Sequence, residues 1–145
     1  MPVACTNAAT ITFPKATSGS ETITHFSVGT ASSGTGKLII TKALDSNLAV
    51  STNIQPQFAA GDLDVAITGN ISDTWISELL THLFTNEAIE LVGDAAGLLP
   101  SATAGSLYVG LHTAAPTTNQ THNEAAYGSY ARVAVARTAG GWTIA

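Results

Sequence analysis

Histidine and acidic side chains are the groups of this sequence most suited to chemistry, and their spacing argues against a metal site. The histidines fall on four different predicted segments: His25, His82, His112 and His122. Zinc sites usually take ligands from pairs separated by one helical turn or a short loop. These histidines have no such spacing, so we expect no metal and interpret them as surface residues or as residues satisfied by local partners.

Two further groupings are weak candidates. Asp62 and Asp64 share one face of a predicted strand and could bind a cation, although a solvated strand face explains them more simply. The run GTGK at residues 34–37 partly matches a phosphate-binding loop, but Ala31 stands where that motif needs its first glycine and Leu38 replaces its Ser or Thr. A nucleophile elbow of the GxSxG type is also absent. We therefore expect no enzyme activity, no catalytic residue and no cofactor.

The remaining reactive or charged candidates are one thiol and two guanidinium groups. Cys5 is the single cysteine and cannot form an intrachain disulfide, so we expect a small, partly buried residue. Arg132 and Arg137 are the charges most suited to function, because they could pair with a partner's carboxylates. Ordinary solvated positions are the alternative for both.

Composition limits the classes of partner. The 145 residues suit a single domain spanning 1–145, and only 10% of them are charged, against about 25% in typical soluble domains. A net charge of −5 provides no basic footprint for nucleic acid. Neither a bilayer-spanning apolar run nor a signal peptide is recognisable. We expect no nucleic-acid or membrane partner, and a homo-oligomer, by default a dimer, because many β edges need covering.

The elements that would position these groups are organised around one helix. Residues 70–86 read NISDTWISELLTHLFTN, with Ser72 or Asp73 suited to cap a helix of about residues 72–86. Its apolar side chains form one stripe at helical spacing: Trp75, Ile76, Leu79, Leu80, Leu83 and Phe84. The stripe is predicted to be core.

Short strands with turn residues between them are predicted on both sides of the helix. The expected strands are 8–13, 22–29, 37–44, 48–54, 57–58, 62–68, 106–113, 130–137 and a final segment 142–144. Residues 87–92 read as helix or strand, 93–105 as a loop, and 114–126 as a long exposed loop. This pattern predicts an all-β fold, a β-sandwich of jelly-roll type with one α-helix.

Two groups of segments resemble a known module. The later group is SLYVGLHTAAP (Ser106–Pro116), NEAAYGSYARVAVAR (Asn123–Arg137) and Trp142; the earlier is NAATITFPKAT (Asn7–Thr17), ITHFSVGTASSGTGKLII (Ile23–Ile40) and PQFAAGDLDV (Pro56–Val65). Each group is similar to one half of a tail-fibre-like module of tailed-bacteriophage structural proteins. Related small proteins act as capsid cement or decoration subunits. The resemblance carries no catalytic residues.

The order of the halves departs from that module. Here the TITFP-like half comes first and the SLYVGLHT-like half second, which suggests a circular permutation or, as the alternative, a fragment of a tandem array whose frame begins mid-module. In the parent order the segment 142–144 would run on into strand 8–13, so we expect these ends to be neighbours, within one chain or by exchange with a second subunit. This places Pro2, Val3, Trp142 and Ile144 in one region, which we predict to be a subunit or capsid contact.

Three functions follow from these observations. The leading hypothesis is a bacteriophage cement protein, made in the host cytoplasm, that binds the major capsid protein lattice at the head surface and stabilises the shell through many copies. A tail or tail-fibre component is the first alternative. A carbohydrate-binding module is the second, with Trp142, Tyr127 or Tyr130 as stacking platforms.

Overall fold

The computed structural model describes residues 3–145, so the predicted contact residue Pro2 lies outside the described residues. The chain forms two compact units, each made of segments distant in sequence. Unit 1 contains residues 3–9, 59–106 and 136–145, and unit 2 contains residues 10–58 and 107–135. The single domain expected from chain length stays a prediction.

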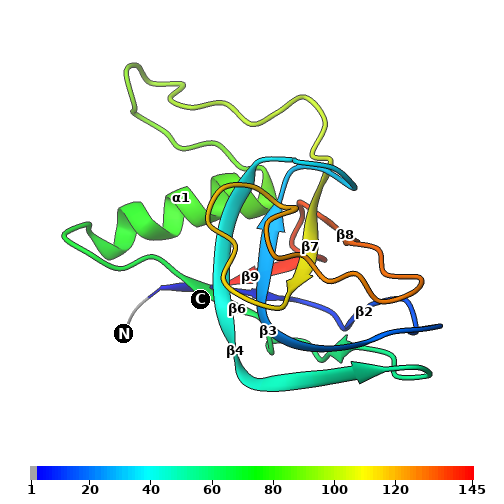
Figure 1. Ribbon diagram of the computed structural model, residues 1–145. Helices are drawn as coiled ribbons and strands as arrows, with labels where there is room; N and C mark the ends of the chain where they lie inside the picture. The colour runs from blue at the N-terminus through cyan, green and yellow to red at the C-terminus, as the bar shows by residue number, and fades with distance from the viewer. Residues whose placement is uncertain (1–2) are drawn as a thin grey trace. The chain divides into compact units, whose positions relative to one another are not determined.

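Strands dominate both units. In chain order they are β1 (Ala4–Asn7), β2 (Ile11–Thr12), β3 (Ser20–Gly29), β4 (Leu38–Ser51), β5 (Gln57–Phe58), β6 (Asp64–Ala66), β7 (Ser106–His112), β8 (Val133–Ala136) and β9 (Trp142–Ile144). One helix, α1 (Asp73–Thr85), is present among residues 3–145 (Figure 1). The all-β, sandwich-like class with one helix is confirmed. The jelly-roll strand order stays a prediction.

Unit 1 combines α1 with a three-stranded sheet of order β6-β1-β9. The central strand β1 pairs antiparallel with both neighbours, so that Cys5 lies opposite Val65 on one side and Ile144 on the other. Cys5 is completely buried, and burial raises the pKa of its thiol to about 12. This thiol therefore stays protonated and unreactive at neutral pH, in agreement with its expected packing role.

Local signals define the ends of α1. Ser72 caps the N-terminus, where its Oγ accepts a hydrogen bond from the Trp75 N–H at 3.2 Å. Asn86 ends the helix in the left-handed conformation, with φ of 60°. Among the described residues no helix is long and apolar enough to cross a membrane.

The face of α1 that enters the core is narrower than predicted. The buried residues are Ile76, Leu80 and Phe84, one row at intervals of four. The parallel row Trp75, Leu79 and Leu83 is only partly buried. Both rows share the helical period, so sequence periodicity alone did not decide which of them is core.

Unit 2 contains a four-stranded sheet of order β4-β3-β7-β8 and a two-stranded sheet of β2 and β5. Strand β3 is central and pairs antiparallel with β4 and β7, and Val28 lies opposite Ile40 and Val109. Leu107, Val109 and Leu111 of β7 are buried, as their alternation predicts. On the smaller sheet, Ile11 pairs with Phe58, and the Phe13 and Phe58 rings meet edge to face at 6.0 Å.

Two strand boundaries differ from prediction. The cluster Asp45-Ser46-Asn47 separates two predicted strands, 37–44 and 48–54, yet β4 continues through it. Both flanking segments pair with β3: Ala43 lies opposite His25 and Leu48 opposite Ile23, and the extra residues between them form a bulge. Figure 1 shows β4 turning along its length. Of the predicted strand 8–13 only Ile11–Thr12 forms a strand, β2 in unit 2, while β1 of unit 1 precedes it at Ala4–Asn7. Long-range pairing, invisible in local alternation, sets both boundaries.

The helix rows can be tested by a pair of truncations. Leu80→Ala removes a side chain with no exposed surface and should lower the free energy of unfolding by about 2–5 kcal/mol. Leu79→Ala, on the partly exposed row, should cost about 1 kcal/mol or less. Urea unfolding of both variants measures the difference. Equal losses would mean that both rows are core.

Candidate interface site

Three of the predicted contact residues, Val3, Trp142 and Ile144, lie at the paired chain ends in unit 1. β9 pairs with β1 of the same chain, and two hydrogen bonds of 2.9 Å join Ala4 and Ala145 reciprocally. The C-terminal segment therefore lies beside the first strand of its own chain. The partner strand is Ala4–Asn7, not the expected 8–13, because residues 8–13 do not form one continuous strand.

Val3 and Ile144 are partly exposed here, whereas Trp142 is only 1% exposed. The Trp142 indole meets the Phe84 ring edge to face, with centroids 4.8 Å apart, and so fills the core between β9 and α1. Its Nε1 is buried and has no hydrogen-bond partner among the described residues. The contact role of these residues stays a prediction, but in the isolated chain Trp142 first serves packing.

A recess of about 460 Å³ lies beside Trp142. Threonine hydroxyls and one carboxylate provide its polar surface, and the lining residues are Thr81, Thr85, Glu87, Ala139, Trp142, Thr143 and Ile144. Within this lining the Thr85 hydroxyl donates to the Thr81 carbonyl at 2.8 Å and lies 3.5 Å from the Glu87 carboxylate.

The Arg137 side chain hydrogen-bonds within unit 1. Its guanidinium donates to the carbonyl oxygens of Leu83 at 2.7 Å, His82 at 2.9 Å and Ala104 at 3.1 Å. The last carbonyls of a helix have no partners within the helix, and a cation is favoured there. Arg137 thus caps the C-terminus of α1 and holds the chain that enters β7.

Arg132 has a comparable role in unit 2. Its Nε and Nη2 contact the two carboxylate oxygens of Glu124 at 2.6 and 2.8 Å, while Nη1 and Nη2 donate to the carbonyls of Ala31 and Gly34. Tyr130 donates its hydroxyl to Glu124 at 2.9 Å, and burial raises the pKa of Tyr130. The predicted partner for Arg132, a carboxylate, is therefore supplied by its own chain.

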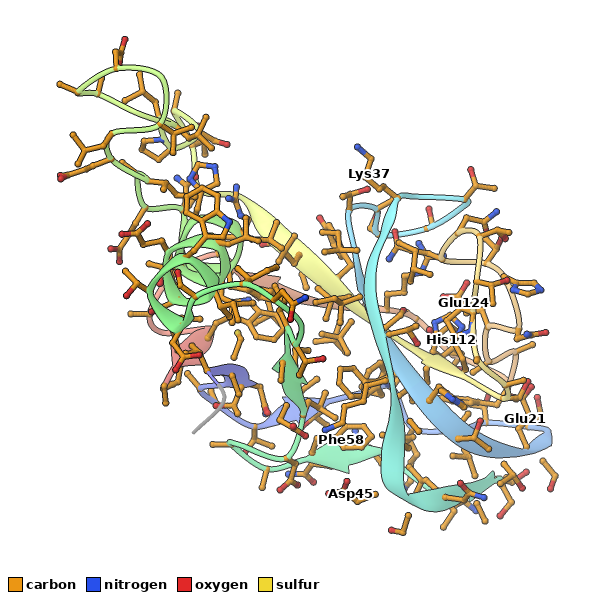
Figure 2. All side chains as sticks on the ribbon, turned by 90° about the vertical axis from the view of Figure 1, so that its left-hand side faces the viewer. Glu21, Lys37, Asp45, Phe58, His112 and Glu124 are labelled. Atoms are coloured by element: carbon orange, nitrogen blue, oxygen red, sulfur yellow. The ribbon has the colours of Figure 1, made fainter. Side chains whose placement is uncertain are left out.

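A buried serine–histidine pair lies in the same unit. His112 donates from Nδ1 to the carbonyl of His122 at 3.0 Å, so its Nε2 accepts from the Ser27 hydroxyl at 2.7 Å. Burial is the largest cause that lowers the pKa of His112. Both side chains are fully buried, so substrate cannot reach the serine and the pair is structural. Figure 2 shows His112 beside Glu124, its bridge partner on the adjoining loop.

The other predicted candidates do not converge. The three remaining histidines bind near neighbours: His25 contacts Thr24, His82 the Glu87 carbonyl, and His122 the Thr117 N–H. Asp62 closes a turn by accepting from the Ala59 N–H at 2.8 Å. Within residues 3–145 no group of three or more His, Cys, Asp or Glu side chains could hold a metal.

The stretch 114–126 is less exposed than predicted. Pro116, Gln120 and Ala125 are buried, and the carboxylate of Glu21 accepts hydrogen bonds from the backbone N–H groups of Ala126 and Tyr127. These anchors were missed because each joins residues about a hundred positions apart. The one sequence signal for such an anchor is that an acidic residue like Glu21 is rare in a chain with few charges.

Gln120 explains one glycine of the GTGK run, Gly36, and also Gly29 before the run. Its Oε1 accepts from the Ala31 N–H at 2.9 Å, and a Cβ at Gly29 or Gly36 would overlap the Gln120 side chain. Gly36 therefore makes room for a buried amide side chain.

The three proposed sugar platforms are occupied by internal packing. Tyr127 is 2% and Trp142 1% exposed. The Tyr127 and Tyr130 rings meet edge to face at 5.4 Å, and Tyr130 also stacks on Phe13 at 6.5 Å. The geometry therefore gives the carbohydrate-binding hypothesis no support.

The Glu124 contacts can be tested by neutralisation. Glu124→Gln keeps the shape but removes the charge that Arg132 faces, and should cost about 1.5–3 kcal/mol of unfolding free energy. Asp45→Asn, at an exposed position of β4, is the matched control and should change stability by about 0.5 kcal/mol or less. A Glu124→Gln loss as small as the control's would show that the pair is effectively solvated.

We predict that the protein loses stability below neutral pH because His112 becomes protonated. Because the pKa of His112 is lowered in the folded state, its stabilising effect is present above the unfolded value of about 6.5 and is lost as the pH falls below it. Chemical unfolding between pH 7.5 and 5 should show a decline that His112→Gln reduces. His82→Gln, in α1, is the control and should keep the decline; an unchanged slope in His112→Gln would exclude this histidine as the cause.

Comparisons with known proteins identify the family. The family described as Podophage GP4 fiber I protein gp80 matches residues 2–66 and 70–144 of this chain. The break between the matched segments falls between the two groups that resemble the halves of a phage module. A search of the curated proteins and a search of the solved structures each gave no match. The matched residues span nearly the whole chain, which therefore belongs to the podophage GP4 fiber I protein gp80 family, a family of phage virion structural proteins.

Proposed function

We propose that this protein is a structural component of a phage tail fibre. The observation that carries the proposal is the match of the fibre family to residues 2–66 and 70–144. The capsid cement role, our leading hypothesis from sequence, is less well supported, because the matched family is described as a fibre protein. Cement binding to the major capsid protein therefore becomes the second candidate.

The geometry supports a structural role. Arg132 and Arg137, two of the five basic residues, are engaged within the chain, and the buried Ser27–His112 pair is closed to substrate. What remains for partners is surface with little charge, together with the edge strands β4, β6, β8 and β9. Such edges favour assembly with further strands, so we propose a homo-oligomer, by default a dimer.

The location of the protein in the virion tests the proposal. Quantitative mass spectrometry of purified particles should give a few to tens of copies, with the major capsid protein and a tail protein of the same particles as internal references. Gold-labelled antibodies should mark the tail fibres in electron micrographs. Hundreds of copies with label over the head would overturn the fibre assignment and favour cement.

A further inference from the structure

An exposed apolar loop follows α1. We call residues 87–105 the leucine loop; Figure 1 shows it as a long excursion without helix or strand after the helix. Four large apolar side chains of this loop are exposed: Leu91 by 79%, Leu99 by 68%, Leu98 by 42% and Val92 by 38%. Among the described residues only two other large apolar side chains, Ile54 and Ile71, are comparably exposed. A cluster of this kind usually marks an interaction site.

Hydrogen bonds hold the base of the leucine loop in place. Ile89 is completely buried and exchanges two backbone hydrogen bonds with Leu98, of 3.0 and 2.8 Å. Asn86 and Ser101 close the base through two further bonds, of 3.0 and 2.9 Å. Asp94 accepts from the Ala96 and Gly97 N–H groups near the tip. The exposed leucines therefore stand on an ordered frame.

The backbone of the leucine loop is in the left-handed region at Leu91 and Gly97. Leu91 has a φ of 66°, a left-handed conformation that is unfavourable for a leucine. Gly97 also has a positive φ, and a Cβ there would overlap the Ile89 carbonyl. The loop thus tolerates strain at its most exposed apolar residue, and strain of this kind is concentrated at functional sites.

Charge defines the partner. Glu87, Glu90 and Asp94 lie in the leucine loop, which contains no Lys or Arg. Two copies meeting loop to loop would bring six carboxylates together, and an anionic membrane would repel the same groups. The complementary surface is an apolar recess bordered by basic side chains.

We propose that the leucine loop is a docking element that inserts Leu91 and Leu99 into an apolar recess, bordered by Lys or Arg, on a different protein of the same virion. The virion location of the partner rests on the proposed function. The docking chemistry rests only on this loop.

Photo-crosslinking on intact particles tests the proposal. Benzoylphenylalanine at Leu91 or Leu99 should crosslink to a peptide of another virion protein that contains apolar and basic residues, as identified by mass spectrometry. Benzoylphenylalanine at Ile54, 41% exposed and outside the loop, is the control and should not label that peptide. A crosslink to a head protein would support docking by the leucine loop but overturn the fibre assignment. Failure of the docking proposal can therefore be distinguished from failure of the proposed function.

A double variant provides the second measurement. Leu91→Asn with Leu99→Ser removes the apolar contacts, and asparagine accepts the left-handed backbone at residue 91. The purified variant should keep the wild-type melting temperature, while its content in virions should fall at least about tenfold; Ile54→Ser should be incorporated normally. The proposal would be overturned by normal incorporation of the double variant or by the absence of any crosslink. It would also be overturned if crosslinks formed only between copies of this chain, or if the protein bound phosphatidylglycerol vesicles in a way that depended on Leu91.

Discussion

Arginine–carbonyl hydrogen bonding is the interaction on which much of this structure depends. Long connections leave backbone carbonyls without strand or helix partners, and a buried unpaired carbonyl costs about as much as a lost hydrogen bond. Arg137 satisfies carbonyls at the end of α1 and at residue 104, and Arg132 satisfies those of the loop before β4. Each guanidinium thus supplies hydrogen bonds to a loop whose carbonyls have no partners in a helix or strand.

The polar groups of unit 2 extend the same principle. Glu124 receives Arg132 and Tyr130, Glu21 receives two backbone N–H groups, and His112 bridges Ser27 to a carbonyl. The Glu124 bonds are internal to the segment 114–132, whereas Glu21 attaches this segment to β3 and His112 attaches it to β7 through the His122 carbonyl, so that a stretch without periodicity is nevertheless ordered. A chain with few charges uses several of them to define its own fold.

This use of charge bears on how the protein meets its partners. Because both arginine side chains hydrogen-bond within the chain, the proposed recognition of partners relies on strand edges and on apolar side chains exposed outside the core. In a member of a phage fibre family, such surfaces suit permanent assembly, because shape and apolar contact are insensitive to salt, whereas exposed ion pairs are screened.

The sequence by itself determined the elements whose information is local. The cap at Ser72 and the helical period defined α1, alternation defined β7, and the long blocks of residues pointed to a phage structural family.

Only the tertiary structure decided what depends on pairs distant in the chain. It selected Ile76, Leu80 and Phe84 over the adjacent row as the buried face, since both rows have one period and burial depends on where the sheet lies. It carried β4 through Asp45–Asn47 and placed β9 beside Ala4–Asn7. The tertiary structure also decided that Arg132 and Arg137 hydrogen-bond within the chain. Their carbonyl partners lie 33 to 101 residues away, and no local sequence pattern indicates contacts over such distances.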